Sequence, residues 1–430
     1  MEIIADTENF SEFSVSSKMR KHIFADLHIH SKYSRATSKN LSLENLEKYA
    51  RIKGLDLLGT GDFQHPKHWQ DIDKGLTEKE GVFYSKTGFP FILQTEISLM
   101  FSQGGKRRAV HLIVFSPSKE VALEVIKYLL SRGRIDYDGR PIFGISGKDF
   151  VRDLKEINDL IEIIPAHCMT PWFGIFGSDT GFDSLRECFE EQAEKIYAIE
   201  SGMSASPDML WRFKENVNIV SFSDSHSFWP FRLGREATIF EVGELSYKEI
   251  IKAIRTGEGL IGTIETPPEY GKYHYDGHRN CGFSCSPSET KKLNGICPKC
   301  GKKLTIGVDY RVNEIAKEGE GYRPEKAKMF LKLLPLHELI ALNLKSGMES
   351  KKTWEAYNGL IGKFGNELKI LLDVSREDLL KEEVDEKLIE LILFNRKGKL
   401  QVKPGFDGEY GEVLMPEKQV KLFLFVMKND

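Results

Sequence analysis

The sequence predicts an α/β domain, either a barrel or an open sheet, followed by a small cysteine-rich module and a mostly helical C-terminal region. Short apolar runs alternate with amphipathic stretches from about residue 21 to 265, and four clustered cysteines come next. Mainly helical patterns then fill residues 324–393. Alternating strands and helices are typical of α/β proteins. A chain of 430 residues, 40% of them hydrophobic, can build more than one domain.

Seven strands are expected in the first domain. Their sequences are HIFADLH, LDLLGT, FILQTEI, AVHLIVF, IEIIPA, IYAIE and NIVSFS, and helical stretches such as LENLEKYARIK and EVALEVIKYLLS lie between most of them. Seven strands is one fewer than in a standard eight-stranded barrel, where the chemistry gathers at the C-terminal ends of the strands.

Histidines and acidic residues fall regularly near the ends of these strands. His28 and His30 close the first strand, and residues two apart on a strand point to the same side. Two such imidazoles suit a metal ion, although a hydrogen-bonded histidine pair has the same pattern. The later strands supply Asp62, Glu96, His111, His167, Glu200, Asp224 and His226.

A site of mixed imidazole and carboxylate ligands suits Zn²⁺, Mn²⁺ or Fe²⁺. Glu96 lies in the sequence between the two histidine groups and could bridge two ions, whereas a third ion would need Asp62 and His226. Two ions about 4 Å apart can bind the oxygens of a phosphoester and generate hydroxide at neutral pH. Phosphoester hydrolysis is therefore the expected chemistry, although amidohydrolases also use metal centres on barrels.

The clustered cysteines predict a structural zinc site. Cys281 and Cys285 are followed, after eleven residues, by Cys297 and Cys300, and Gly301 permits the tight turn of a zinc knuckle. We expect the four thiolates to close a tetrahedral site. Cys168 and Cys188 are interpreted as buried core thiols.

Six motifs resemble, in order, those of the PHP (polymerase and histidinol phosphatase) phosphoesterase superfamily: DLHIHS, GTGDF, QTEIS, HLIVF, IPAHC and SDSHS. The resemblance covers residues 21–265 and implies a distorted seven-stranded (β/α) barrel with two to three divalent ions (Zn²⁺, Mn²⁺ or Mg²⁺). It implies a first metal site from His28, His30, Glu96 and Asp224, and a second from Glu96, His111 and His167.

The sequence departs from the common PHP pattern at the third metal site. Many members have an Asp-His pair where this chain has Asp62-Phe63, and an Asp-Gly pair where it has Arg35-Ala36. These substitutions remove expected ligands and leave Asp62 and His226 to hold a third ion.

The whole chain resembles the endonuclease Q family of DNA-repair enzymes through ATSKN, GTGDFQHPKHW, the four-cysteine module, PLHELIALNLKSG, FGNELKILLDVS and PGFDGEYGEV. This resemblance implies cleavage 5′ to a deaminated base (uracil, hypoxanthine or xanthine) or an abasic site, leaving a 3′-hydroxyl and a 5′-phosphate. His28, His30, Glu96, Asp224 and His226 are then the catalytic residues. The expected organisation is an N-terminal extension (1–20), a barrel (21–265), a zinc module (266–312) and a helical domain (313–430).

Two kinds of segment are candidates for DNA contact. A deaminated base must leave the duplex to be read, and aromatic side chains can stack on it. The loops 170–178 and 227–235 carry aromatic residues, and the tract 103–108 is basic, with core packing and a solvated hairpin tip as the alternatives. The candidates are Lys106, Arg107, Arg108, Trp172, Phe173, Trp229 and Phe231.

The remaining expectations concern partners and location. Gln419, Leu422 and Phe425 have the spacing of a sliding-clamp binding box, but a C-terminal strand explains them equally well. We see neither a secretory signal nor an apolar run of about 20 residues, so we expect a cytoplasmic protein that does not enter membranes. The alternative functions are a phosphatase for small phosphate esters and a non-catalytic lesion-binding scaffold.

Overall fold

The structure is a computed structural model that describes residues 21–414, and these form two units. The first unit contains residues 21–265 and 314–330, and the second contains residues 266–313 and 331–414. Residues 314–330, which were expected in the helical domain, therefore pack with the first unit instead. The predicted extension at residues 1–20 and the predicted clamp-binding residues Gln419, Leu422 and Phe425 lie outside the described part.

All seven strands expected from the sequence form in the first unit. They are β1 (Lys21–Asp26), β2 (Leu57–Gly59), β5 (Pro90–Gln103), β6 (Lys106–Ser116), β8 (Glu162–Pro165), β9 (Ala198–Glu200) and β10 (Asn218–Val220). The sequence did not predict β11 (Ala237–Val242) and β12 (Leu260–Glu265), nor the short strands β3 (Thr77–Lys79), β4 (Val82–Tyr84) and β7 (Ile142–Phe143).

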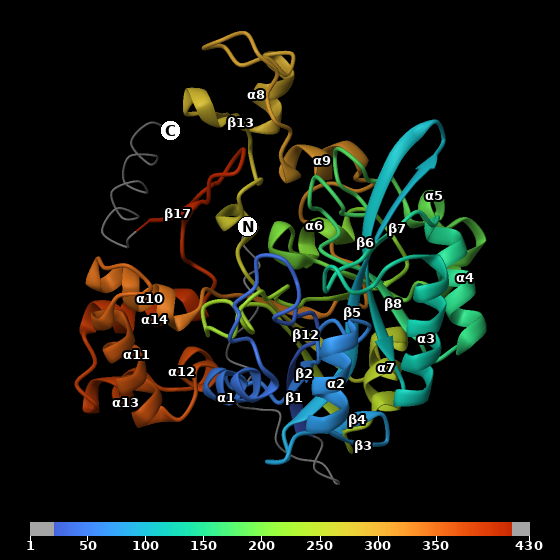
Figure 1. Ribbon diagram of the computed structural model, residues 1–430. Helices are drawn as coiled ribbons and strands as arrows, with labels where there is room; N and C mark the ends of the chain where they lie inside the picture. Colours follow the sequence, from blue (N-terminus) through green and yellow to red (C-terminus); the bar gives the residue numbers. More distant parts are fainter. Residues whose placement is uncertain (1–20, 415–430) are drawn as a thin grey trace. The chain divides into compact units, whose positions relative to one another are not determined.

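The strands form a mixed α/β architecture around a large sheet. Strands β1, β2 and β5 pair in parallel, and β9 pairs in parallel with β10 in a separate two-stranded sheet. The long hairpin of β5 and β6 is antiparallel, as are the pairs β6–β8 and β1–β11 (Figure 1). Strands β2, β8 and β9 are buried at every position, which agrees with their continuous apolar sequences.

Helices flank this sheet and begin at serine caps. Helices α1 (Leu43–Lys53), α3 (Lys119–Arg132), α4 (Gly147–Ile157) and α7 (Tyr247–Thr256) each follow a serine whose side chain accepts a hydrogen bond from a backbone N–H of the first turn. Figure 1 shows α3 and α4 side by side along the β6–β8 region. Each of the four helices buries one apolar face and leaves a charged face toward solvent.

Single hydrogen bonds join strand ends that the regular ladders leave apart. The amide of His30, just beyond β1, donates to the carbonyl of Ser225, beyond β10, at 3.0 Å. The amide of Cys168, beyond β8, donates to the carbonyl of Glu200, at the end of β9, at 2.9 Å. These bonds hold the C-terminal end of β1 beside that of β10, and the end of β8 beside that of β9.

The second unit contains the cysteine module and a helical region. The module has the short hairpin of β13 (Asp276–His278) and β14 (Phe283–Cys285), followed by α8 (Pro287–Lys292). The mostly helical character predicted for the region after it is confirmed, with α10 (Leu336–Leu344), α11 (Lys351–Phe364), α12 (Glu367–Leu372), α13 (Arg376–Lys381) and α14 (Glu386–Arg396). None of the helices within residues 21–414 has the length and apolarity needed to cross a bilayer.

Candidate metal centre

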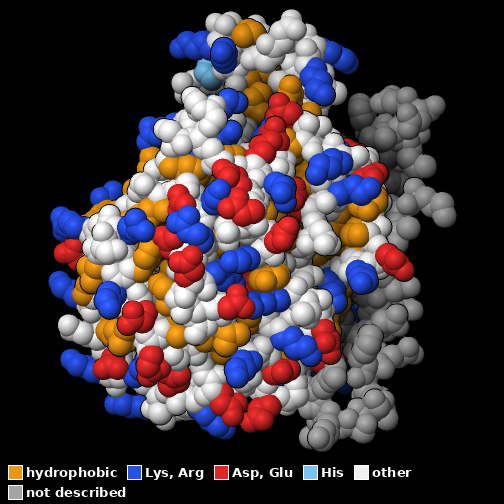
Figure 2. Space-filling model, turned by 90° about the vertical axis from the view of Figure 1, so that its right-hand side faces the viewer, with side chains coloured by type: hydrophobic (Ala, Val, Ile, Leu, Met, Phe, Trp, Pro, Cys, Tyr) orange, Lys and Arg blue, Asp and Glu red, His pale blue; other side chains and the backbone are white. Residues whose placement is uncertain are grey.

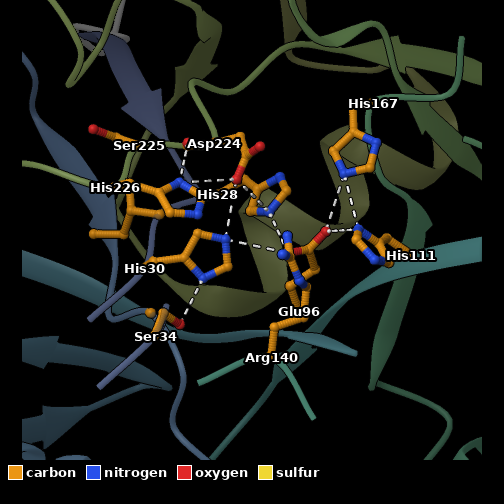
Figure 3. Close-up of polar contacts among 12 residues, drawn as sticks. His28, His30, Ser34, Glu96, His111, Arg140, His167, Asp224, Ser225 and His226 are labelled. Carbon is orange, nitrogen blue, oxygen red and sulfur yellow. Dashed lines mark hydrogen bonds and ion pairs between the residues drawn. The ribbon is translucent and has the colours of Figure 1, made fainter. Parts of the chain in front are cut away.

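Glu96 lies at the centre of the site, on β5, and each of its carboxylate oxygens faces a different pair of histidines (Figure 3). Its Oε2 lies 3.6 Å from His28 Nε2 and 3.2 Å from His30 Nε2. Its Oε1 lies 2.8 Å from His111 Nδ1 and 3.1 Å from His167 Nε2. One carboxylate can therefore serve two adjoining sets of ligand atoms.

Asp224 completes the first set. Its Oδ1 lies 3.0 Å from His30 Nε2 and 3.7 Å from His28 Nε2. The ligand atoms of His28, His30, Glu96 and Asp224 all lie within 4.8 Å of one another, and so do those of Glu96, His111 and His167. Both sets are the ones that the PHP resemblance implies.

The surroundings of His28 fit a metal ligand better than a hydrogen-bonded core histidine. Its buried Nε2 has no hydrogen-bond partner among the described residues, and the two nearest carboxylate oxygens are 3.6 and 3.7 Å away. Those separations are too long for hydrogen bonds but suit atoms that share an ion. A buried polar nitrogen without a partner is costly, and a cation bound there would remove that cost.

The pKa values of the ligands shift in both directions: burial lowers those of His28, His30 and His167, but neighbouring carboxylates outweigh burial and raise them. The pKa values of Glu96 and His111 shift in the direction that suits cation binding. Burial raises the pKa of the Glu96 carboxyl, but His111, Arg140 and His28 outweigh burial and hold that pKa well below its usual range. Burial lowers the pKa of His111 to about 4, so its imidazole is neutral at pH 7 and has a free lone pair. The centre therefore presents an ionised bridging carboxylate beside a neutral imidazole.

Two further carboxylates orient the histidines from behind. Glu200 contacts His28 Nδ1 at 2.9 Å and also accepts a hydrogen bond from the backbone amide of His167. Asp62 contacts His30 Nδ1 at 3.0 Å. A carboxylate on the far nitrogen of a metal-binding imidazole fixes its tautomer and its direction. The strand pattern predicts Glu200 at a strand end, but it does not predict this orienting contact.

Asp62 lies in a different place from the one expected of a third metal ligand. Its Oδ2 accepts hydrogen bonds from the Ser31 amide at 2.7 Å, from the Ser31 hydroxyl at 2.6 Å and from the Ser34 hydroxyl at 2.8 Å, while Oδ1 faces His30. Both oxygens therefore already have partners. Within residues 21–414, Asp62 belongs to neither of the two sets of ligand atoms that lie within 4.8 Å of one another around Glu96. The His226 ring lies 4.4 Å from that of His30, and its Nδ1 donates to the Asp224 carbonyl.

Arg140 is a residue of the centre that the sequence did not predict. Its Nη1 lies 3.1 Å from Glu96 Oε2, on the side of the first ligand set (Figure 3). It follows Asp138 and Gly139 in a loop before β7, far in sequence from every predicted motif. A polar turn sequence of this kind carries no signal of proximity to a metal.

The cysteine module differs from the expected four-cysteine site. The grouped ligand atoms are those of His278, Cys281, Cys297 and Cys300, and His278 Nδ1 lies 3.3 Å from Cys300 Sγ. Cys285 lies outside this group, with its Sγ 3.2 Å from Thr290 Oγ1, and it shares the small apolar core of the module with Cys297. The signal for His278 was its two-residue spacing to Cys281, which repeats the spacing of Cys297 and Cys300.

The candidate DNA-contacting residues divide into exposed and buried groups. Lys106 and Arg107 are exposed at the β5–β6 hairpin, and the side chain of Trp172 is 45% exposed. On the face that Figure 2 shows, basic and acidic side chains are interspersed and do not gather by sign. The distribution of charge on this face therefore does not mark a DNA-binding surface.

The other candidates make contacts within the protein. Phe231 is buried. Arg108 donates to the Gly181 carbonyl and lies over the ring of Phe182. The remaining two aromatic candidates also pack on other rings, Phe173 on His111 at 4.4 Å and Trp229 on Tyr49 at 5.4 Å between ring centroids.

Comparisons with known proteins agree with this geometry. Residues 335–399 match the family described as the MJ0043 C-terminal domain. The structure is similar to the lesion-specific endonuclease PfuEndoQ of Pyrococcus furiosus, with 32% identity, a TM-score of 0.84, and coverage of 93% of this chain and 97% of that one. It is similar to an endonuclease Q bound to a 27-mer duplex substrate with an abasic lesion at the active site, with 32% identity, a TM-score of 0.82, and coverage of 93% and 98%.

A longer relative contains a similar sequence. The chain is 33% identical over 324 residues to the uncharacterized protein MJ0043 of Methanocaldococcus jannaschii. This match covers 71% of the chain but only 39% of that relative.

Replacement of Asp62 by asparagine separates an orienting role from a ligand role. Asp62→Asn keeps the size of the side chain and removes its charge, so we expect the number of bound ions per chain to stay the same. Their affinity should fall by about 10- to 100-fold, as is usual for a lost orienting carboxylate. Metal titration followed by calorimetry measures both quantities. Loss of one whole ion per chain would instead make Asp62 a ligand.

The cysteine module is tested by comparing His278→Ala with Cys285→Ser. We expect Cys285→Ser to keep the wild-type zinc content and His278→Ala to hold one equivalent less, because only the second change removes a grouped ligand atom. Elemental analysis of the purified full chain gives both values. The opposite pattern would restore the four-cysteine site.

Proposed function

Because the chain belongs to the endonuclease Q family, we propose that it is a metal-dependent endodeoxyribonuclease that nicks DNA 5′ to deaminated bases or abasic sites. The observation that carries this proposal is the bridging position of Glu96 between two histidine pairs. That arrangement supports hydrolysis of a phosphodiester with two ions. Uracil, hypoxanthine and xanthine are the proposed bases, and a 3′-hydroxyl and a 5′-phosphate are the proposed ends.

The proposed framework for this site is a distorted seven-stranded PHP barrel. In support, the ladders connect β10 to β9, β8 to β6, β6 to β5, β5 to β2 and β2 to β1. The single hydrogen bonds at Cys168–Glu200 and His30–Ser225 link β8 to β9 and β10 to β1. Together these pairings support the proposed closed order of the seven strands.

We propose that the centre holds two divalent ions and the cysteine module one structural Zn²⁺. His28, His30, Glu96 and Asp224 would hold the first ion, and Glu96, His111 and His167 the second. Bound Zn²⁺, Mn²⁺ or Mg²⁺ would supply Lewis acidity and make a bound water more acidic. His278, Cys281, Cys297 and Cys300 have the donor set of a closed structural zinc site.

In the proposed reaction, the oxygen of a water molecule attacks phosphorus and the bond from phosphorus to the 3′-oxygen breaks. The water loses a proton and the departing 3′-oxygen gains one. His226 is placed for this proton transfer beside the first ligand set. Because a carbonyl only accepts, its Nδ1 must donate to the Asp224 carbonyl, and a neutral His226 ring then has a free lone pair on Nε2.

The alternative functions have less support. A phosphatase for small esters would not need the cysteine module and the helical region. The similarity to lesion endonucleases covers 93% of the chain and therefore favours the nuclease. A non-catalytic scaffold would not need four histidines converging on one carboxylate. The duplex bound by the related endonuclease Q supports DNA as the partner of this chain.

Alanine at His30 tests the proposed nuclease. We expect His30→Ala to nick a uracil-containing or abasic duplex at least about 100-fold more slowly than the wild type, because it removes a ligand of the first ion. Single-turnover cleavage of an end-labelled duplex measures the rate and maps the cut. His22→Ala is the matched control, since His22 lies near the exposed start of β1. Full nicking by His30→Ala would refute the assignment.

Trp172 is the exposed aromatic residue best suited to stack on DNA bases in the loop after His167. We expect Trp172→Ala to bind a lesion duplex more weakly by about 5- to 100-fold, the usual range for a lost base stack. Fluorescence anisotropy without divalent ions measures the dissociation constant. Leu130→Ala, which changes a 57% exposed side chain on α3, is the control. Equal affinity of Trp172→Ala and the wild type would remove Trp172 from the binding surface.

A further inference from the structure

The loop before β7 carries one guanidinium into the ligand cluster. Arg140 Nη1 lies 3.1 Å from Glu96 Oε2, and 29% of the side chain is exposed. The guanidinium therefore contacts the bridging carboxylate and still reaches solvent. It faces the first ligand set, whose Asp224 and Glu96 carboxylates raise the pKa of Arg140, with Glu96 the stronger influence.

Hydrogen bonds from several segments hold this loop in place. Asp138 Oδ1 accepts from the backbone amides of both Arg35 and Arg140 at 3.2 Å. The Gly139 amide donates to the Tyr33 carbonyl, and the Gly139 carbonyl accepts from Gln64 Nε2 at 2.6 Å. The position of Arg140 is thus fixed by its neighbours and does not depend on its contact with Glu96 alone.

Gly139 shows how closely the loop approaches the site. A Cβ built on Gly139 would overlap both Ser34 Oγ and Asp62 Oδ2. Only glycine leaves room for the loop against these two side chains, which themselves contact His30. This close approach brings Arg140, the next residue, to the edge of the first ligand set.

Arg35, which departs from the PHP pattern, and Asp62, which keeps the acid of that pattern, both contact this loop. Arg35 stands where many members have an acid, and its Nε lies 3.3 Å from Asp138 Oδ2. Asp62 packs against Gly139 and has both of its oxygens engaged by His30, Ser31 and Ser34. Asp62, one of the two residues from which a third set of metal ligands was expected, therefore lies against the loop that carries the cationic Arg140.

We propose that Arg140 is a further catalytic residue, which binds a non-bridging oxygen of the scissile phosphate and stabilises the negative charge that develops there. An arginine offers five N–H donors in a planar fork that matches phosphate oxygens, and Glu96 engages one of them. Its charge does not depend on pH, so it can replace a third cation at the edge of the site. This inference rests on the proposed phosphodiesterase function.

A fixed guanidinium can stabilise the transition state of phosphoryl transfer. Negative charge spreads over the non-bridging oxygens in the transition state, and fixed cationic donors stabilise it without reorganisation. A guanidinium that merely neutralised Glu96 would instead act only on metal binding. The two roles predict different results when the phosphate oxygen itself is removed.

The test combines Arg140→Ala with chemically altered DNA. The substrate is an abasic duplex whose scissile phosphate is a methylphosphonate, prepared as two separate diastereomers. We expect Arg140→Ala to lower the single-turnover rate on ordinary lesion DNA by about 100- to 1,000-fold with unchanged metal content. In one diastereomer the methyl group replaces the oxygen that Arg140 contacts. That replacement should slow the wild type much more than it slows Arg140→Ala, because the variant has already lost the contact. If each diastereomer slowed Arg140→Ala by the same factor as the wild type, the proposal would be overturned.

A binding measurement distinguishes this proposal from the proposed function. Inorganic phosphate is titrated into the metal-loaded full chain, and we expect Arg140→Ala to bind it about 10- to 100-fold more weakly than the wild type. Arg140→Lys, which keeps the charge but loses the fork, should fall between the two. Equal phosphate affinity in all three proteins would overturn the role of Arg140, whether or not the wild type cuts DNA.

Two controls complete the design. Arg152→Ala removes an exposed arginine of α4 that pairs with Asp149 and Asp153, and it should behave as the wild type in every assay. A wild type that leaves all lesion duplexes uncut would refute the proposed function, while the phosphate titration would still decide the role of Arg140.

Discussion

The whole centre depends on one buried carboxylate whose two oxygens face opposite ways. Glu96 is inaccessible to solvent, and an isolated charge at such a place is costly. Four imidazoles and one guanidinium surround it, so each oxygen of Glu96 has a cationic or metal-binding neighbour. Because the carboxylate is rigidly held in the middle of β5, it fixes the separation of the two ligand sets. The spacing of the two ligand sets is thus a property of the sheet and of a single side chain.

This constraint explains why orienting contacts lie behind the histidines. An imidazole that shares an ion must point one nitrogen at it, and its other nitrogen then needs a partner. Glu200 provides that partner for His28, and Asp62 provides it for His30. His167 is held in a similar way, with its Nδ1 2.9 Å from the Thr170 hydroxyl. Each contact comes from a different segment, so the directions of the imidazoles are set by the tertiary structure.

Local patterns in the sequence were enough to predict seven of the strands and the residues that gather around Glu96, but contacts across the fold were not predictable from them. Apolar runs located the seven strands, and ordered motifs located Glu96 and its histidines. The orienting role of Asp62 could not be predicted from the chain, because it depends on Ser31 and Ser34 folding back onto its carboxylate. Arg140 lies in a turn whose sequence fits any exposed loop. The spacing of the cysteines favoured Cys285, but the ligand group contains His278 in its place, and Cys285 Sγ lies beside the Thr290 hydroxyl.

The backbone holds strain that these contacts must offset. Asp62, His167 and Asp224 each have positive φ (38°, 29° and 47°). They lie in the turns that follow β2, β8 and β10. Such conformations cost on the order of 1–3 kcal/mol each for residues other than glycine. Gly202 shows how tightly the turn at His167 is enclosed, since a Cβ there would lie 2.7 Å from the Cβ of His167. These three turns direct polar side chains toward the same site. Positive φ is expected at such turns when the placement of the side chains, and not backbone preference, determines the conformation. The fully buried strands β2 and β8, which precede two of these turns, supply packing that offsets this strain.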